Sequence, residues 1–538
     1  MAPSTEMRHW GWGEDRFAGE LPANVEGWLG GRFGQPLRAL TPAPEASAVR
    51  ITRSALSKKA ISKLASVVGS ANVRTDHGSR LIHAAGKGYP DLISMRSDRK
   101  VPAPDAVVYP ASHSEIRSLL KICSKVGIAV VPFGGGTSVV GGVTPLKGKF
   151  DSVITLDLGR MRELISLDER SRTAVFSAGL RGPELEHLLR ERGFTLGHFP
   201  QSFEYSTVGG WVATRSAGQA SSGYGRIDEK LLGAKLAAPA GELDLFTRPA
   251  SAAGPDLRSL VAGSEGAFGV ISEVALEVSP APEVTRFDAW MLPSFESAAD
   301  ALKGLAQAGL APEIARSSDE AETELALASA SVEGAKGKLF EGYLKSRGAA
   351  SGSLVILGWE GATGTIDSRR REVLSLLKPF GAVGLGAGAG RSWARSRFQT
   401  PYLRDHLMAR GVMVETLETA TTWSNLMHLY RGVGQALSEH APVVGCHISH
   451  LYQSGASLYF TFVAPQDIES PWEQWHDAKT AACEAVVAHG GTITHHHAIG
   501  IDHKKFLKQE DGAAGVTALK AVKASLDPAG VMNPGKLL

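Results

Sequence analysis

The stretch that decides the fold is IAVVPFGGGTSVVGG, residues 128–142, in which an apolar run leads directly into a glycine-rich turn. The run 128–133 is typical of a strand that is buried on both faces. In the turn, the missing Cβ atoms let backbone N–H groups approach a phosphate, and Thr137 and Ser138 add hydroxyl donors. The spacing is not that of a Walker P-loop, and no helical pattern follows as a dinucleotide fingerprint requires. The turn by itself therefore predicts either an anion cradle or a plain structural turn.

Two further segments rich in small residues favour the cradle. FEYSTVGGWVATRSAGQASSGYG, residues 203–225, has no clear periodicity and is interpreted as a loop folded over something, and SEGAFG, residues 264–269, again precedes a strand. One domain seldom needs several such segments unless its backbone lies close to a flat or phosphorylated ligand. The three segments together predict a long ligand that is held along its length.

Composition excludes several classes of protein. The 538 residues carry 57 Lys+Arg against 55 Asp+Glu, a net charge of +2 that gives no electrostatic case for nucleic acid as a partner. Cys123, Cys446 and Cys483 are few and widely spaced, which argues against a disulfide scaffold and favours a reducing cytoplasm. The first residues lack the apolar core of a signal peptide, and no apolar run is long enough to span a membrane. We expect a glycine-rich cytoplasmic enzyme.

The pattern along the chain predicts a mixed α+β architecture. The aromatic opening with Trp10, Trp12 and Phe17 is expected to pack on the body of the protein. Ser112 and Glu115 form a capping box before a helix that Gly127 ends. The other expected elements are helices at 54–68, 182–193, 318–348, 366–378, 474–489 and 513–526, strands at 107–110, 151–158 and 354–361, and a hairpin at 232–246.

Several motifs, in this order and spacing, resemble a known family. PFGGGTSVVGG, FEYSTVGGWVATRSAG and GSEGAFGVISE resemble the FAD domain of vanillyl-alcohol oxidase type flavoproteins, as does the ending DPAGVMNPGKLL. Within that group STVGGWVATR, MRHWGWGED, SGASLYFTF and THHHAIG resemble the alkyldihydroxyacetonephosphate synthase (alkylglycerone-phosphate synthase) family, over nearly the whole chain. The resemblance implies an α+β fold with four parts: an N-terminal portion at 1–99, an FAD-binding domain at 100–281, a substrate or cap domain at 282–480, and a C-terminal segment at 481–538 whose His-rich loop returns to the FAD domain.

The resemblance also implies which residues hold the FAD. Many related oxidases attach the flavin through a histidine of the first loop, and this loop has none, so non-covalent FAD is expected. Gln201 stands where the family has an acidic residue, which should alter one flavin contact without abolishing binding. The implied FAD-binding residues are Pro132, Phe133, Gly134, Gly135, Gly136, Thr137, Ser138, Gln201, Ser202, Ser206, Thr207, Thr214, Arg215, Ser216, Ala217, Glu265, Gly266, Ala267, Phe268, Gly269, Val270 and Ile271.

Three consecutive histidines, His495, His496 and His497, are candidates for proton handling. In an extended segment the first and third share one face, and His496 points the other way. A zinc site with Cys446, His447 and His450 is a weaker alternative, because no CxxC or carboxylate completes a familiar spacing, and histidines that only satisfy backbone carbonyls are another. We expect no metal. The resemblance implies that the histidines are needed for activity.

Tyr459 lies in LYFTFV, where apolar side chains alternate with Tyr459 and Thr461, so the tyrosine is expected on the polar face of a strand. A phenol with an ordinary pKa near 10 needs cationic or hydrogen-bonding neighbours to act as a base, and histidines and an arginine would supply them. A half-buried structural tyrosine is the plain alternative. The resemblance implies that Tyr459 is the catalytic acid/base.

Four further residues are assigned by the resemblance alone. Arg316 matches an arginine near the reactive edge of the flavin, and His198 matches an active-site histidine. Arg404 matches a substrate-contacting arginine, whose guanidinium fork suits a phosphate, and Thr416 stands where the family has a serine. We therefore place His198 and Arg316 with the catalytic residues and Arg404 and Thr416 with the substrate.

The implied activity is an FAD-dependent exchange of the acyl chain of 1-acyl-dihydroxyacetone phosphate for a long-chain fatty alcohol, without net redox change and through a covalent flavin N5 adduct. Its lipid-like substrates imply a hydrophobic tunnel and peripheral contact with a membrane face, and the family implies a homodimer. One alternative is a flavin oxidoreductase acting on a small 2-hydroxy acid such as D-lactate or glycolate. A non-catalytic flavin-binding protein is the other, and the joint presence of the tyrosine, arginines and histidines argues against it.

Overall fold

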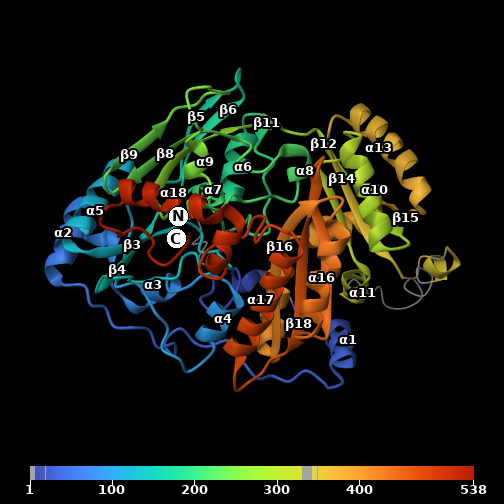
Figure 1. Ribbon diagram of the computed structural model, residues 1–538, viewed down its shortest axis with the longest axis horizontal. Helices are drawn as coiled ribbons and strands as arrows, with labels where there is room; N and C mark the ends of the chain where they lie inside the picture. The colour runs from blue at the N-terminus through green and yellow to red at the C-terminus, as the bar shows by residue number, and fades with distance from the viewer. Residues whose placement is uncertain (1–6, 19, 330–341, 348, 350) are drawn as a thin grey trace.

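Three larger β-sheets organise the computed structural model, which describes residues 7–18, 20–329, 342–347, 349 and 351–538. A four-stranded and a five-stranded sheet lie on one side of the molecule, and a seven-stranded sheet lies on the other (Figure 1). The predicted α+β class is therefore confirmed.

The first sheet contains the predicted strand 128–133 and has the strand order β1-β2-β4-β3. β4 pairs in parallel with both β2 and β3, and β1 pairs antiparallel with β2. The predicted N-cap is present, because the Ser112 hydroxyl accepts a hydrogen bond from the Glu115 N–H at 3.2 Å, but the Glu115 carboxylate accepts from the Ala111 N–H at 2.7 Å and so does not complete the capping box. The strands are Val73–Arg74 (β1), Ala106–Val108 (β2), Ile128–Phe133 (β3) and Ser152–Asp157 (β4), and the helices are Lys58–Val68 (α2), His77–Ile82 (α3), Tyr89–Met95 (α4) and His113–Val126 (α5).

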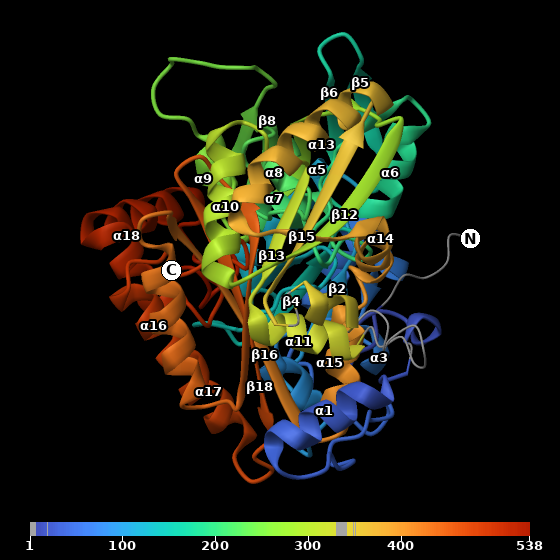
Figure 2. The ribbon, with the colours of Figure 1, turned by 90° about the vertical axis from the view of Figure 1, so that its right-hand side faces the viewer.

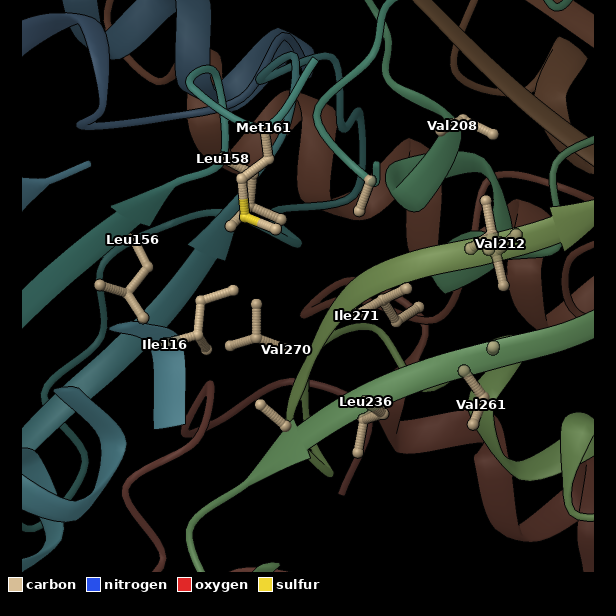
Figure 3. Packing of buried hydrophobic residues seen from close by; sticks show 14 of the residues in the cluster. Ile116, Leu156, Leu158, Met161, Val208, Val212, Leu236, Val261, Val270 and Ile271 are labelled. Carbon is tan, nitrogen blue, oxygen red and sulfur yellow. The ribbon is translucent and has the colours of Figure 1, made fainter. Parts of the chain in front are cut away.

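The second sheet is antiparallel throughout, in the order β5-β6-β10-β8-β9. The predicted hairpin is its β8–β9 edge. Its strands are Leu164–Asp168 (β5), Thr173–Ser177 (β6), Leu231–Ala238 (β8), Gly241–Leu245 (β9) and Val270–Glu277 (β10), accompanied by the helices Gly182–Arg190 (α6) and Arg258–Val261 (α9) and by the strand pair Phe194–Thr195 (β7) and Ser279–Pro280 (β11). Figure 3 shows the core that joins the two sheets, where Ile116 of α5, Leu156 of β4 and Val270 of β10 pack together.

The prediction of an aperiodic loop over 203–225 was wrong, because this segment contains helices Val208–Thr214 (α7) and Ser221–Tyr224 (α8). The Thr207 hydroxyl caps α7 by accepting a hydrogen bond from the Gly210 N–H at 3.3 Å. A Cβ on Gly209 would lie 2.6 Å from the Ala178 Cβ, so this glycine lets the helix pack closely on the sheet. Tertiary packing thus overrides the poor helix propensity of a glycine pair.

The seven-stranded sheet has the order β15-β12-β14-β13-β17-β18-β16, with every neighbouring pair antiparallel. The strands are Val284–Leu292 (β12), Ile314–Ser318 (β13), Ser353–Gly361 (β14), Val383–Leu385 (β15), Val412–Thr422 (β16), Val443–Leu451 (β17) and Gly455–Pro465 (β18). The helices are Ala23–Phe33 (α1), Phe295–Gln307 (α10), Glu320–Ser329 (α11), Thr363–Leu377 (α13), Gly386–Ser396 (α14), Thr400–Ala409 (α15), Leu426–Ser438 (α16) and Pro471–Ala488 (α17). The expected helix 318–348 is α11 at its start, and residues 330–341 lie outside the described residues.

The two faces of this sheet differ. Leu458, Phe460 and Phe462 of β18 join the apolar core under α10, α13, α16 and α17, and α16 and α17 run beside β16 and β18 in Figure 2. The intervening residues Tyr459 and Thr461 are only half-buried and lie on the opposite face, as the alternation predicted. This second face is the one that carries the candidate site.

The C-terminal segment and part of the first described segment, residues 7–18, pack against the body. Val130 of β3 exchanges backbone hydrogen bonds of 2.8 Å with Val531 and Asn533, which places the C-terminal segment beside the first sheet after helix Leu507–Leu526 (α18). Trp12 is 4% exposed and packs with Tyr205 and Tyr402, as expected, whereas Phe17 is 43% exposed and that part of the prediction was wrong. Within the described ranges, no helix is both long enough and apolar enough to cross a bilayer. All three cysteines are buried and free.

Candidate active site

The three glycine-rich segments converge on one another. A Cβ on Gly134 would lie 2.2 Å from the Thr207 Oγ1, and one on Gly135 would lie 2.0 Å from the Tyr205 carbonyl oxygen. The first and third segments are joined by Asn533, whose Nδ2 donates to the carbonyl oxygens of Gly142 at 3.2 Å and Glu265 at 2.6 Å. The second and third are joined where the Glu265 N–H donates to the Ala213 carbonyl at 2.9 Å. The segments therefore form one continuous wall.

This wall fits the FAD that the sequence predicts. The backbone N–H groups of Gly135, Gly136 and Thr137 have no hydrogen-bond acceptor among the described residues, and Gly136 has a φ of 67°. Successive N–H groups in such a turn form a concave anion site that suits a pyrophosphate. The Ser264 Oγ and the His198 Nδ1 are also buried without a partner in the part of the chain that the structure describes. Unpaired buried donors and acceptors of this kind require a ligand or water.

Other predicted FAD residues use their side chains within the protein. Val270 and Ile271 belong to the apolar core, so these two side chains are structural. The Gln201 amide donates to the Arg397 carbonyl at 2.7 Å, and the Ser206 hydroxyl accepts from the Trp211 indole at 2.6 Å. The Thr214 hydroxyl and the Arg215 guanidinium donate to the carbonyls of Gly210 at 3.0 Å and Ala262 at 3.2 Å. Contacts of Thr214 and Arg215 with a cofactor would come from their backbone.

The second face of the seven-stranded sheet gathers the polar candidates. On the four adjacent strands β13-β17-β18-β16 it carries Arg316, His447, Tyr459 and Glu418. His447 and Glu418 are the two cross-strand partners of Tyr459, and Thr416 is the partner of Thr461. Cross-strand partners on one face lie only about 5 Å apart, so the pairing register itself assembles the site.

Tyr459 is enclosed by rings. It stacks on His447 with a centroid distance of 4.7 Å and an angle of 17°, and its edge meets His497 at 5.4 Å and 84°. Burial raises the pKa of Tyr459 to about 12, although a hydrogen bond with Thr416 and the charge of Arg404 act to lower it. The expected hydrogen-bonding and cationic neighbours are therefore present, but they do not lower the pKa of Tyr459 below its ordinary value, because desolvation of the phenolate outweighs them.

Glu418 organises the three histidines. Its fully buried carboxylate accepts hydrogen bonds from the Thr494 hydroxyl at 2.7 Å and from the backbone N–H groups of His495 at 2.6 Å, His496 at 2.8 Å and His497 at 2.6 Å. Burial alone would raise the pKa of Glu418, but the neighbouring imidazoles and these donors hold it well below its usual range.

The alternation predicted for the three histidines was wrong, because their N–H groups converge on one carboxylate and the segment curls around it. His496 and His497 both face Tyr459, with ring centroids at 6.2 and 5.4 Å. His495 faces elsewhere: its Nε2 lies 2.6 Å from the Tyr452 hydroxyl, and its ring stacks on His450 at 5.0 Å. Burial lowers the pKa of all three imidazoles, which are therefore neutral near pH 7.

The zinc alternative with Cys446, His447 and His450 was wrong as drawn, because Cys446 points into the apolar core on the opposite face from His447. The ligand atoms of His450, His495 and His496 do lie close enough to hold a metal ion, as do those of Glu418, His496 and His497. The second group is a poor cage, since four donors already occupy the Glu418 oxygens. The absence of a metal stays a prediction.

The predicted arginines have different surroundings. Arg316 forms an ion pair with Glu322 and lies 3.1 Å from the His447 Nδ1, and Glu322 contacts the same nitrogen at 2.8 Å. Arg404 donates through Nη1 to the Lys87 carbonyl at 2.7 Å, and its Nη2 forms a long ion pair of 3.6 Å with the Asp405 Oδ1. Its Nε is buried without a hydrogen-bond partner among the described residues. The Arg404 Nε is thus available to an anion, whereas the Arg316 guanidinium is engaged by Glu322 and His447.

His198 is fully buried, with its Nε2 3.2 Å from the hydroxyl of Ser216 in the second glycine-rich segment. Burial lowers the pKa of His198 to about 3, so it is neutral. Sequence reasoning missed Glu418, Glu322, His447 as a stacking partner, and Lys87. An acidic residue within the strand segment ETLETATT is the signal that points to Glu418, because strands are depleted in glutamate.

Comparisons with known proteins agree with this geometry. Residues 104–244 match the family model described as FAD binding domain, and residues 281–537 match the one described as FAD linked oxidases, C-terminal domain. A solved p-cresol methylhydroxylase superposes with a TM-score of 0.69 at 15% identity, covering 90% of this chain and 98% of that one, which shows the fold alone. The chain is an FAD-dependent enzyme with the vanillyl-alcohol oxidase type of fold.

The relatives narrow this class. The alkyldihydroxyacetonephosphate synthase of Trypanosoma brucei brucei is 36% identical over 89% of this chain and 80% of its own length, and that of Dictyostelium discoideum is 32% identical over 87% and 78%. A solved alkyldihydroxyacetonephosphate synthase superposes with a TM-score of 0.86 at 28% identity, covering 98% of both chains. The chain belongs to the alkyldihydroxyacetonephosphate synthase family.

Proposed function

We propose that this enzyme exchanges the acyl chain of 1-acyl-dihydroxyacetone phosphate for a long-chain fatty alcohol, forming an ether bond without net redox change. The bond between C1 and the acyl oxygen breaks and a fatty acid leaves. The alcohol oxygen bonds to C1 and loses its proton, so one acid is released for each ether formed. When bound, FAD supplies an electron-accepting ring at the substrate carbon.

The observation that carries the proposal is the gathering of Tyr459 and the His495–His497 loop around Glu418, on the sheet face that also holds Arg316. As a neutral phenol, Tyr459 takes the C1 proton at its oxygen while its own proton moves to a neighbouring neutral imidazole. The buried carboxylate of Glu418 stabilises the imidazolium that results. The proton then returns to C1 by the reverse route after the alcohol has added.

Binding and orientation belong to other side chains. The Arg404 guanidinium binds the substrate phosphate through its unpaired Nε, because a guanidinium is a suitable donor to phosphate oxygens. Thr416 orients the Tyr459 phenol by its hydrogen bond. Arg316 contacts His447 and thereby orients the imidazole that stacks on Tyr459. His198 and Ser216 line the FAD wall behind them.

The test is an exchange assay on the purified, FAD-loaded enzyme. Labelled hexadecanol and 1-palmitoyl-dihydroxyacetone phosphate should give labelled ether product and one fatty acid per turnover, with no oxygen uptake and no dye reduction. Reduction of a dye by D-lactate or glycolate without any exchange would overturn the proposal.

Three finer features belong to the same proposal. The FAD is non-covalent, so heat denaturation should release all of the flavin into the supernatant. The enzyme is a cytoplasmic homodimer that touches membranes peripherally, through an apolar surface that leads to its acyl site. Light scattering of the purified protein and flotation with neutral phosphatidylcholine vesicles test these two features, and a monomer or the absence of flotation would contradict them.

A further inference from the structure

A lysine outside every predicted site lies between the FAD wall and Arg404. Lys87 is the middle residue of a Gly-Lys-Gly turn between α3 and α4. Its backbone N–H donates to the Ser138 carbonyl at 2.6 Å. A Cβ on Gly86 would lie 2.3 Å from that same oxygen, and one on Gly88 would lie 2.8 Å from the Val139 carbonyl oxygen. Only a glycine-flanked turn can approach the first FAD loop this closely, so the position of Lys87 is fixed on that loop.

The other side of the turn is held by the cap. Arg404 of α15 donates to the Lys87 carbonyl at 2.7 Å, which brings the unpaired Nε of Arg404 next to this lysine. Lys87 is 4% exposed, and its ammonium donates a hydrogen bond to the Arg8 carbonyl at 2.6 Å. No second acceptor for it occurs among the described residues, which leaves two of its three N–H donors unused.

Lys87 lies among charged groups of both signs. Arg8, Arg96 and Arg404 are its positive neighbours, and the negative ones are Asp91, Asp405, Asp15 paired with Arg8, and Glu415 beside Asp91. Asp405 contacts Arg8, the Trp12 N–H and, at 3.6 Å, the Arg404 Nη2, and Asp91 accepts a hydrogen bond from the Gly88 N–H at 3.2 Å. Burial lowers the pKa of Lys87 to about 8, and Arg404 and Arg8 lower it further while Asp405 and Asp91 raise it. A buried ammonium with two unused N–H donors is costly unless an anion accepts their hydrogen bonds.

We propose that Lys87 is a second phosphate-binding residue, whose ammonium binds with Arg404 the phosphate dianion of the substrate. This inference rests on the proposed function, since it concerns the head group of the same substrate. Through this contact Lys87 makes the enzyme prefer phosphorylated to unphosphorylated substrates. The turn that carries Lys87 also contacts the backbone of the first FAD loop.

The test compares Lys87→Met with Lys59→Met, which removes an exposed lysine of α2, and with Lys87→Arg. For the acyl exchange, kcat/KM of Lys87→Met should fall about 10- to 100-fold with the phosphorylated substrate, as for the loss of a hydrogen bond to a charged group. It should stay within about 3-fold with acyl-dihydroxyacetone lacking the phosphate. Lys59→Met should match wild type, and Lys87→Arg should regain most of the loss. Equal losses on both substrates, or none, would overturn the inference.

A binding measurement separates this inference from the proposed function. Dihydroxyacetone phosphate is titrated calorimetrically into each FAD-loaded variant, whether or not exchange occurs. Wild-type affinity should fall as the pH rises above the Lys87 pKa of about 8, while Lys87→Arg should show no such fall, because an arginine stays charged. Identical pH profiles for the two proteins would overturn the role of Lys87 even if exchange were observed. Normal binding profiles without exchange would overturn the proposed function instead.

Discussion

Replacing Glu418 with glutamine tests the core of the site, because one buried carboxylate holds the whole histidine loop. Three donors reach its Oε1, namely the Thr494 hydroxyl and the N–H groups of His496 and His497, and the His495 N–H reaches its Oε2. A glutamine keeps one acceptor oxygen and turns an NH2 group toward the fourth donor. The substitution therefore loses one charge-assisted hydrogen bond and weakens three.

The magnitude follows from these contacts. A hydrogen bond to a charged group contributes about 1.5–3 kcal/mol and a neutral one about 1 kcal/mol, so the loop should lose roughly 3–5 kcal/mol of local stability. Hydrogen exchange in residues 494–500, followed by mass spectrometry, should accelerate at least about 100-fold. The rate of the enzymatic reaction, in which the alcohol replaces the acyl chain, should fall by a similar factor. The imidazolium that forms during proton transfer also loses the negative charge of Glu418.

The matched control is Glu510→Gln in α18, whose carboxylate binds the residues that directly precede the same loop. The Glu510 carboxylate also accepts two hydrogen bonds, from the Thr492 hydroxyl at 2.5 Å and the Ile493 N–H at 3.0 Å, but the residue is exposed. The Glu510→Gln substitution should leave both turnover and the rate of hydrogen exchange in residues 494–500 close to wild type. The reasoning would be refuted if the Glu418→Gln enzyme kept wild-type protection against hydrogen exchange in residues 494–500 and a turnover within about 3-fold of wild type.

Three further substitutions test other parts of the account. Tyr459→Phe should retain the FAD absorbance spectrum and lose exchange activity, because only the phenol oxygen is removed; retained activity would contradict its assigned role. Gly135→Ala places a methyl group 2.0 Å from the Tyr205 carbonyl oxygen, so the purified protein should contain little FAD, and full occupancy would contradict the proposed wall. Burial raises the pKa of Glu265 to about 7 from an ordinary value near 4.5, so the protonated form favours the folded state. Stability from this group is present at low pH and lost as the pH rises toward 7, and Glu265→Gln should flatten that part of a thermal-unfolding pH profile; an unchanged profile would contradict it.

The fold was predictable where local signals and burial agree. The strand 128–133, the capped helix that starts after Ser112 and the hairpin at 232–246 each carry periodicity and turn chemistry that point to one structure. The loop prediction for residues 203–225 was wrong because their glycines lower the helix propensity of a segment that becomes helical only when it packs on a sheet. The division into domains at 99, 281 and 480 stays a prediction.

The site was predictable as a set of residues and not as an arrangement. Alternation placed Tyr459 on the correct face, but its partners His447 and Glu418 come from other strands, and strand register cannot be deduced from one sequence. The orientation of His495–His497 was missed because a distant carboxylate, and not local backbone preference, shapes that loop. The direction of the Tyr459 pKa shift was missed because desolvation depends on burial by segments remote in the chain.

The roles assigned to Tyr459, His198, Thr416 and the arginines remain proposals, and one measurement tests the central claim behind them most directly. The FAD-loaded enzyme is incubated without oxygen or dye with 1-palmitoyl-dihydroxyacetone phosphate and labelled hexadecanol, and products are counted. The account predicts labelled ether and released palmitate in a 1:1 ratio with the flavin spectrum oxidised before and after, as an exchange without net redox change requires. No labelled ether, together with flavin reduction by D-lactate or glycolate, would contradict it.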